Sequence, residues 1–393
     1  MTERVHTNAQ WKEMRFDEFF DMLPTNTLSR DKLNSQRGDY QNIHYGDVLI
    51  KYPYCLDCNN NEIPYINDGV KFNTTEVKDG DVIFADTAED DTVGKCVEVL
   101  NVGDRRIVSG LHTYFCRPKC KMAPGYLGYF LNSDHFHNQL LPYIAGSKVS
   151  SVNRTSISRT YIFYPDSPSA QSRIAAILSS TDKVITSTQK VIAKYKQMKQ
   201  GLMEDLLKPK EGWKMVKLGD IGEFYVGGDV DKSCFSPYPT MECKYPIYAN
   251  ALVDEGLYGY SSKYEFDKEA VTITGRGDVG KVFYRKPYFS TIIRLVTLIP
   301  DKDSDIDVRF LSYAMSKINF IIESTGVPQL TAPQAKKYAV PVPFKNDKPD
   351  LDEQQRIANI LSGIDAKIAA EERVLEKYNL IKKGLMERLL NEK

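Results

Sequence analysis

The chain has 393 residues, of which 26% are charged, 42% hydrophobic and 11% aromatic. At roughly 100–200 residues per domain, this length predicts two or three domains that each bury a core. The aromatic content argues against disorder, and no apolar run approaches the ~18 residues of a membrane-spanning helix. The first residues lack the apolar segment of a secretion signal, so we expect a cytoplasmic protein.

The charges balance, with 52 lysine and arginine residues against 52 aspartate and glutamate residues. A protein that coats nucleic acid through charge alone is usually basic, so this balance argues against non-specific coating. It leaves open a local basic surface, or a partner that supplies positive charge.

A long repeat organises the chain. QSRIAAILSSTDKVITSTQKVIAKYKQMKQGLMEDLL (171–207) and QQRIANILSGIDAKIAAEERVLEKYNLIKKGLMERLL (354–390) align without a gap, and roughly half of their positions are identical. A weaker pair, WKEMRFDEF (11–19) and WKMVKLGDI (213–221), lies further towards the N-terminus. We therefore predict a duplicated unit of one domain followed by one helix, with the boundaries 1–165, 166–210, 211–345 and 346–393.

Both long repeats are predicted to be helices, because they lack proline and their apolar residues recur every three or four positions. About 37 residues at 1.5 Å each span roughly 55 Å, more than one domain requires. Thr181 and Thr188 fall on the apolar row, which indicates a partly polar seam. The row predicts contacts between the helices or with a partner, through Ile174, Ile177, Val184, Val191, Tyr195, Leu202, Ile357, Ile360, Ile364, Val374, Tyr378 and Leu385. Separate packing of each helix on its own domain is the alternative.

The segments between the helices are predicted to be mixed α/β with more strand than helix. VKDGDVIFAD (77–86) and TIIRLVTLIP (291–300) are rich in strand-forming residues, whereas VRFLSYAMSKINFII (308–322) is typical of a short helix. The fold class is therefore α+β, with two mixed α/β domains. Their flanks are similar but their middles are not, as expected of modules with different targets.

GRGDVGKV (275–282) is the one string similar to a phosphate-binding loop. Val282 replaces the serine or threonine that would hold magnesium, and a strand-like segment follows where that loop requires a helix. We predict a hairpin turn instead. No Ser/His/Asp or Cys/His pattern and no methyltransferase tetrapeptide is present, so we expect no catalytic site in this chain.

The seven cysteines are expected to be free thiols. Cys55 and Cys58, together with Cys116 and Cys120, could form a structural zinc site. Their spacing fits such a site only in part, so ordinary core positions are the preferred interpretation.

Basic residues gather in the segments predicted to be loops. Arginine and lysine contact phosphates and read guanine, while asparagine and glutamine read adenine. A solvated surface charge is the alternative for each of them. The candidates include Arg105, Lys148, Asn153 and Arg154 in the first module, and Lys232, Arg276, Lys281, Arg285 and Arg294 in the second.

The duplicated frame resembles the specificity subunit of type I restriction–modification enzymes. The resemblance rests on WKMVKLGDI, on GRGDVGKV and on STGVPQLTAPQAKKYAVPVP (324–343), which continues into the second long repeat. The first module has weaker versions, among them AGSKVSSVNRTSISRTYIFYP (145–165). The resemblance covers nearly the whole chain, and its specificity comes from the order and duplication of these strings.

The resemblance implies two target-recognition domains separated by two long helices that pack as an antiparallel coiled coil. Each domain would read one half of a split, asymmetric site in double-stranded DNA. Two modification subunits would bind S-adenosylmethionine and methylate adenine, and restriction subunits would use ATP and Mg²⁺. The chain itself would hold no cofactor and no metal.

By position in the resemblance, we expect DNA contacts at two places. One is the loop before each long helix, with Lys148, Asn153, Arg154, Gln329 and Thr331, and the other is the glycine turn, with Arg276, Lys281 and its counterpart Lys95. Two other classes of protein remain as alternatives. One is a coiled-coil adaptor without DNA specificity, and the other is a nucleotide-hydrolysing enzyme built on GRGDVGKV.

Overall fold

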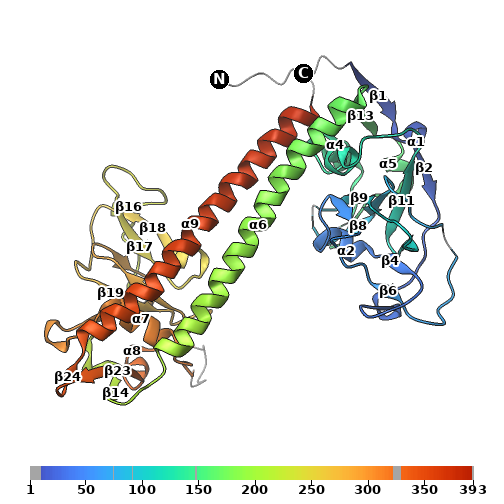
Figure 1. The fold of residues 1–393 in the computed structure, drawn as a ribbon. Coiled ribbons are helices and arrows are strands. Elements are labelled where there is room, and N and C mark those ends of the chain that lie inside the picture. Colours follow the sequence, from blue (N-terminus) through green and yellow to red (C-terminus); the bar gives the residue numbers. More distant parts are fainter. Residues whose placement is uncertain (1–9, 74, 91, 147, 322–328, 392–393) are drawn as a thin grey trace. The chain divides into compact units, whose positions relative to one another are not determined.

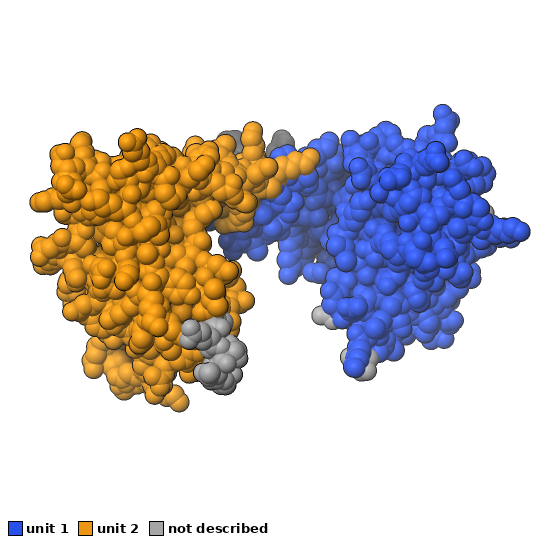
Figure 2. Space-filling view, turned by 90° about the horizontal axis from the view of Figure 1, so that it is seen from below, with its two compact units in different colours: residues 1–189, 373–393 blue, residues 190–372 orange. Residues whose placement is uncertain are grey.

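A computed structural model describes residues 10–73, 75–90, 92–146, 148–321 and 329–391. The chain divides into two compact units, Met1–Gln189 with Arg373–Lys393, and Lys190–Glu372 (Figure 1, Figure 2). Each unit contains one strand-rich domain and part of both long helices. Among the described residues, no helix is long and apolar enough to span a membrane. Residues 324–328, at the start of one motif quoted above, lie outside the described residues.

The first domain is built on two main sheets. One has five strands in the order β2-β11-β7-β9-β5, and the other has four in the order β10-β4-β6-β3. Strands β1 and β13 pair separately, as do β8 and β12. The elements are β1 (Trp11–Arg15), α1 (Phe16–Phe19), β2 (Phe20–Leu23), η1 (Arg30–Lys32), β3 (Leu33–Asn34), β4 (Gln41–Ile43), α2 (Tyr45–Ile50), β5 (Cys55–Asp57), β6 (Tyr65–Ile66), β7 (Val82–Ala85), β8 (Thr87–Ala88), β9 (Cys96–Leu100), β10 (Ile107–Ser109), β11 (Thr113–Pro118), α3 (Tyr126–Phe130), α4 (Asp134–Leu140), η2 (Leu141–Tyr143), β12 (Ser150–Ser151), α5 (Arg154–Ile157) and β13 (Tyr161–Pro165).

The second domain has two four-stranded sheets, ordered β15-β22-β19-β20 and β16-β18-β17-β21. A third sheet joins β14, β23 and β24. The elements are β14 (Trp213–Lys217), η3 (Leu218–Asp220), β15 (Gly222–Val226), η4 (Lys232–Cys234), β16 (Phe235–Ser236), β17 (Tyr245–Tyr248), η5 (Val253–Gly256), β18 (Leu257–Ser261), β19 (Ala270–Ile273), β20 (Val282–Arg285), β21 (Ser290–Thr291), β22 (Val296–Pro300), η6 (Lys302–Ser304), α7 (Val308–Ser316), α8 (Ala332–Ala335), β23 (Ala339–Lys345) and β24 (Lys348–Pro349).

The two domains share the topology of eight strands, to which the first domain adds β5 and the β8–β12 pair. The order β2-β11-β7-β9 corresponds to β15-β22-β19-β20, and β10-β4-β6-β3 corresponds to β21-β17-β18-β16. The orientations also correspond, because β4 and β10 are parallel, as are β17 and β21, while the other matched pairs are antiparallel. The duplication therefore includes the middles of the domains, whose sequences share little.

Strand β7 shows how sequence fixes the core of the first domain. All four of its residues are buried, because both faces of the sheet are covered. Val82 and Phe84 point into one hydrophobic cluster, and Ile83 and Ala85 point into the other. This is the two-residue alternation of a strand, and it makes a continuous apolar run the expected sequence for a central position.

The long repeats form α6 (Pro168–Leu206) and α9 (Leu351–Leu390), as predicted. In the second unit, Lys196 pairs with Glu372 and Lys199 pairs with Asp365, at 2.7 and 2.6 Å. From the first pair to the second, the residue number rises on α6 and falls on α9. The two helices therefore pack antiparallel, as the resemblance implies.

The C-terminal end of each repeat packs on the domain of the other repeat. Leu390 is fully buried in the first domain's core with Leu178, and Leu207 is buried in the second domain's core with Leu361. The first core is thus completed by Leu390, which is distant from that domain in sequence, whereas Leu207 lies directly before the second domain. This burial explains why the apolar row continues to the last turns of both repeats.

The predicted apolar row is only partly buried. Ile174 and Ile357 lie in the cores, whereas Val184, Val191 and Val374 remain more than one-third exposed. On α6 the buried positions in this stretch are Thr181 and Thr188, which belong to the predicted row, and Ile185 and Ile192, which each follow one of the exposed valines. The threonines are tolerated because a hydroxyl can bond within its own helix, as Thr181 Oγ1 does to the Ile177 carbonyl at 3.1 Å.

Two polar networks, one in each unit, attach the domains to the helices. Each contains a tyrosine hydroxyl of the domain that donates to a helix aspartate, which is also paired with a lysine of the other helix. The two sets are Tyr129, Asp182 and Lys382, with distances of 2.7 and 2.7 Å, and Tyr313, Asp365 and Lys199, with distances of 2.6 and 2.6 Å.

Candidate nucleic-acid interface

Two chain segments of the second domain meet at one end of strands β19 and β22, which we call the edge of the domain, and the segment before α8 joins them there. The register pairs Ile273 with Val296, so the turn after β19 and the residues before β22 lie at the same end of these strands. The turn contributes Arg276 and Lys281, and Arg294 lies two residues before β22. All three basic side chains are exposed. The structure therefore brings together three of the residues predicted to contact DNA.

Arg276 is bonded directly to Gln329, another predicted contact residue. Its Nε and Nη2 atoms both donate to the Gln329 Oε1 atom, at 3.0 and 2.9 Å. The two residues come from the glycine turn and from the segment before α8, so the fold joins the two motifs that the sequence indicated separately.

Asn250 holds the backbone under this pair. Its Oδ1 atom accepts a hydrogen bond from Gly275 N at 2.7 Å, and its Nδ2 atom donates to the Ile293 carbonyl. Leu330 N donates to the Gly275 carbonyl at 2.8 Å. A Cβ atom on Gly275 would lie 2.8 Å from the Leu330 carbonyl oxygen, so only glycine permits this approach.

Ile293 and Arg294 both have left-handed backbones, with φ of 54° and 61°. This region is costly for a branched residue such as isoleucine, and such strain is concentrated at functional sites. Hydrogen bonds from Ile293 N to the Gly228 carbonyl, at 2.8 Å, and from Arg294 N to the Gly227 carbonyl, at 2.9 Å, hold the conformation. Arg294 is therefore presented from a fixed backbone.

Two other predicted residues of the second domain are placed differently. Thr331 is the N-cap residue before α8, in a capping box with Gln334, and its hydroxyl donates to the Gln334 Oε1 atom at 2.9 Å. Lys232 lies in η4, whose Cys234 carbonyl accepts from Ser262 N at 3.1 Å, beyond the last residue of β18. Asn250, which supports the Arg276–Gln329 pair, follows β17 near the first residue of β18. Lys232 therefore lies at the opposite end of the β16-β18-β17-β21 sheet from this pair.

The corresponding edge of the first domain carries Lys148, Asn153 and Arg154. Strand β12, which follows the exposed Lys148, pairs with β8 directly beyond β7. Asn153 is the N-cap of α5 and accepts from Ser156 N at 2.8 Å. Its position before α5 corresponds to that of Thr331 before α8.

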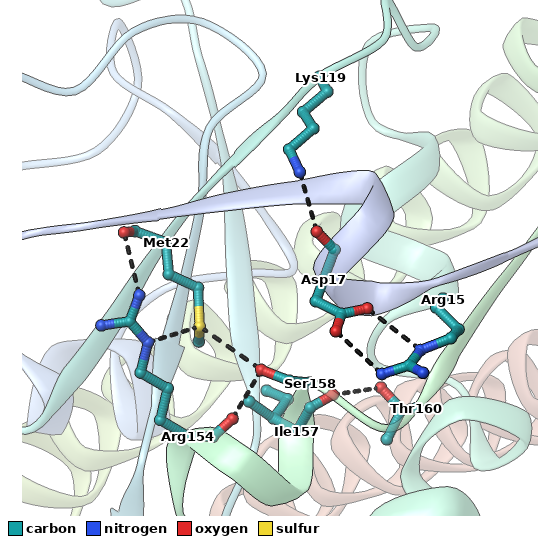
Figure 3. A network of polar contacts seen from close by, with 8 residues as sticks. All are labelled: Arg15, Asp17, Met22, Lys119, Arg154, Ile157, Ser158 and Thr160. Atoms are coloured by element: carbon teal, nitrogen blue, oxygen red, sulfur yellow. Dashed lines mark hydrogen bonds and ion pairs between the residues drawn. The ribbon is translucent and has the colours of Figure 1, made fainter.

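Arg154 bends back towards strand β2 (Figure 3). Its Nε atom lies 3.1 Å from the Met22 sulfur, and its Nη2 atom donates to the Met22 carbonyl at 3.3 Å. The guanidinium is nevertheless exposed. It is held against the strand and still retains free donors for an anionic partner.

Lys95 and Arg105 lie at opposite ends of β9, so they do not share one site. The Lys95 ammonium donates to the Leu49 carbonyl at 2.6 Å, at the C-terminal end of α2. Burial lowers the pKa of Lys95. Arg105 is exposed beyond the other end of β9. Arg285, also expected in a loop, is in β20 and is fully buried, with its guanidinium 3.7 Å from the centre of the Tyr248 ring.

Sequence reasoning missed one pair at the edge of the first domain. His112 Nδ1 lies 3.3 Å from Asp86 Oδ1, and both residues flank the paired ends of β11 and β7. His112 precedes β11 as Arg294 precedes β22. Asp86 ends the strand-like segment VKDGDVIFAD and His112 belongs to no quoted motif, so only the strand register could have joined the two.

The cysteines that suggested zinc are not brought together. Cys58 and Cys116 are buried in different hydrophobic clusters, and Cys120 is exposed. Burial raises the pKa of the Cys58 thiol to about 11. Among the residues that the structure describes, no group of three histidine, cysteine or acidic side chains could hold a metal.

The glycine turn is a hairpin, as predicted. It connects the antiparallel strands β19 and β20, and no helix follows it. Gly280 N and Lys281 N bond back to the carbonyl and hydroxyl oxygens of Thr274, both at 2.9 Å. These amides are therefore not free to cradle a phosphate.

Comparisons with known proteins agree with this architecture. A model of the type I restriction modification DNA specificity domain matches residues 8–197 and again 210–379. A putative type I specificity subunit of Mycoplasma pneumoniae is 28% identical over 53% of this chain and 56% of its own length, so the chain spans about half of that relative. The putative type I restriction enzyme MjaX specificity subunit of Methanocaldococcus jannaschii is 28% identical over 80% of this chain and 78% of its own.

The fold is also similar to a solved structure. The S subunit of a type I restriction–modification system from M. genitalium has a TM-score of 0.65 at 16% identity, covering 99% of this chain and 98% of that one. The duplicated domain matches and this likeness agree with the two domains and two long helices described above. The chain therefore belongs to the family of type I restriction–modification DNA specificity subunits.

Proposed function

We propose that this chain selects the DNA sequence for a type I restriction–modification complex, with each domain reading one half of a split, asymmetric site. One observation carries the proposal. Two domains that share the topology of eight strands present different side chains at corresponding edges, namely Arg276, Gln329 and Arg294 in one and Lys148, Asn153 and His112 in the other. Two domains that share their strand topology and differ in their exposed side chains are suited to reading two different half-sites.

The chemistry of these edges supports DNA as the ligand. Arginine and lysine side chains contact phosphates and guanine, and amides and histidine can bond to base edges. The zero net charge implies that partner proteins share the phosphate contacts. A site with few phosphate contacts of its own depends on those partners for affinity.

The helices support a scaffolding role. Apolar side chains lie exposed on α6 and α9. Val184, Val191, Met198, Val374 and Ile381 follow the apolar spacing of the repeats, and Leu380 lies beside it. We assign them to the docking of two modification subunits that bind S-adenosylmethionine, with restriction subunits that use ATP and Mg²⁺ joining the assembly. The chain would supply no catalytic group and would act in the cytoplasm, where the DNA is.

Mapping of adenine methylation in host DNA tests the proposal. The modification subunit is produced with and without this chain, and the methylated motifs are compared. A split, asymmetric motif that depends on the chain is the expected result. Identical motifs in both samples would contradict the proposal and favour a coiled-coil adaptor without DNA specificity.

A further inference from the structure

Arg276 and Gln329 form one hydrogen-bonded group at the edge of the second domain. Two guanidinium N–H groups of Arg276 donate to the single Gln329 Oε1 atom, at 3.0 and 2.9 Å. A carbonyl oxygen has two lone pairs, so the acceptor capacity of this amide is fully used.

The groups that remain on this pair are donors. They are the Arg276 Nη1 atom, the second hydrogen of its Nη2 atom and the amide nitrogen of Gln329. In the major groove, adenine presents an acceptor at N7 and a donor at N6, so reading it requires a donor and an acceptor. Guanine presents two acceptors, N7 and O6. The pair therefore complements guanine and does not complement adenine.

The pair is also held in place. Asn250 bonds to Gly275 N, next to Arg276, and Leu330 N, next to Gln329, bonds to the Gly275 carbonyl at 2.8 Å. The backbones that carry the two side chains are thus joined to each other. Because Gln329 fixes the plane of the guanidinium, the remaining fork points in a set direction, which sequence reading requires and a simple phosphate contact does not.

We propose that Arg276, oriented by Gln329, reads one guanine in the half-site of the second domain. Arg276 is the specificity residue, and Gln329 is a positioning residue whose own adenine-reading capacity is used up by Arg276. The inference rests on the proposed function, since it names the base that this edge recognises.

The test uses the chain in complex with its modification subunits and the site found by methylation mapping. Each guanine of the second half-site is replaced, one at a time, by 7-deazaguanine, which lacks the N7 acceptor but still pairs with cytosine. One position is expected to weaken binding by the wild-type complex about tenfold, a share of the discrimination of a bidentate contact. Arg276→Ala removes every donor of the fork, so it should abolish this difference. Arg276→Lys keeps the charge but not the planar fork that Gln329 orients, so it should reduce the difference while the salt dependence of binding is retained.

Two further variants complete the test. Gln329→Ala should reduce the 7-deazaguanine effect at the same position and leave the salt dependence unchanged. Arg356→Lys, on α9 and paired with Glu353, is the matched control and should behave like wild type.

The result can contradict the inference in two ways. If Arg276→Ala weakens binding by the same factor for every sequence and lowers the salt slope by about one, while Arg276→Lys binds like wild type, Arg276 contacts a phosphate. If no guanine position responds in the wild-type complex, the assignment of guanine is wrong, although specific binding persists. Failure of the proposed function is distinct, because the wild-type complex would then show no sequence preference at all.

Discussion

Glu98 is a buried acid in the first domain, with only 1% of its surface exposed. Its two carboxylate oxygens accept hydrogen bonds from Gly125 N and Gly128 N, both at 2.8 Å, which fixes the start of α3. Burial nevertheless raises its pKa to about 7, against about 4.5 for an exposed glutamate. The folded chain thus binds a proton more tightly than the unfolded chain does.

This shift predicts a pH dependence of stability. Because the folded pKa is raised, the contribution of Glu98 is fully present below about pH 4.5 and is lost as the pH rises through about 7. Between pH 5 and pH 8 the free energy of unfolding should fall by up to about 3 kcal/mol more in wild type than in Glu98→Gln. Urea unfolding at both pH values measures this, and an equal change in the two proteins would contradict it.

The roles of some residues could be predicted from the sequence, and those of others could not. Arg276 and Gln329 were both selected from motifs, but their contact joins positions far apart in the chain and depends on the tertiary fold. Lys95 was predicted as the counterpart of Lys281, yet its ammonium donates to the Leu49 carbonyl at the end of α2. A repeat in sequence indicates equivalent backbone positions, whereas the direction of a long side chain depends on its neighbours.

At the level of elements, the two polar networks predict matched effects. Asp182 and Asp365 occupy corresponding positions of the repeats, and each bonds a domain tyrosine and a lysine of the other helix. Asp182→Asn should destabilise the first unit and Asp365→Asn the second, each by about 1–2 kcal/mol, because a partly buried charged acceptor is lost.

Thermal unfolding and amide hydrogen exchange measure these changes unit by unit. Asp352→Asn, at the first turn of α9, is the matched control and should have little effect. Equal destabilisation of both units by either variant would show that the networks are not local attachments.

The elements also show where sequence patterns are informative. Helices α6 and α9 were predictable, because a periodicity of three and four residues over about 37 positions is a local signal. The shared strand order was not, because β4 pairs with β10 and β17 with β21 through contacts distant in sequence. The middles of the domains keep this order with different residues, so sequence comparison alone underestimated the duplication.

At the scale of the molecule, the C-terminal end of the chain completes the N-terminal domain. Leu390 is fully buried in the core of the first unit, whereas Leu380 on the same helix is 67% exposed. Leu390→Ala should therefore cost about 2–4 kcal/mol of unfolding free energy, and Leu380→Ala should cost almost nothing.

Hydrogen exchange provides the spatial readout for this pair. Leu390→Ala should accelerate exchange in α3 of the first domain and leave the core of the second domain unaffected. Similar exchange in the two leucine variants would mean that Leu390 does not support that core.

The central claim is that each domain reads its own half-site, and a chimera tests it most directly. Residues 16–160, between β1 and β13, are replaced by residues 218–338, between β14 and β23, which share the topology of eight strands. Co-purification with the modification subunit first establishes that the chimera assembles. Adenine-methylation mapping should then give a motif in which both halves are the half-site of the second domain. A motif unchanged from wild type would contradict the account, because the replaced domain would then have no part in the choice of sequence.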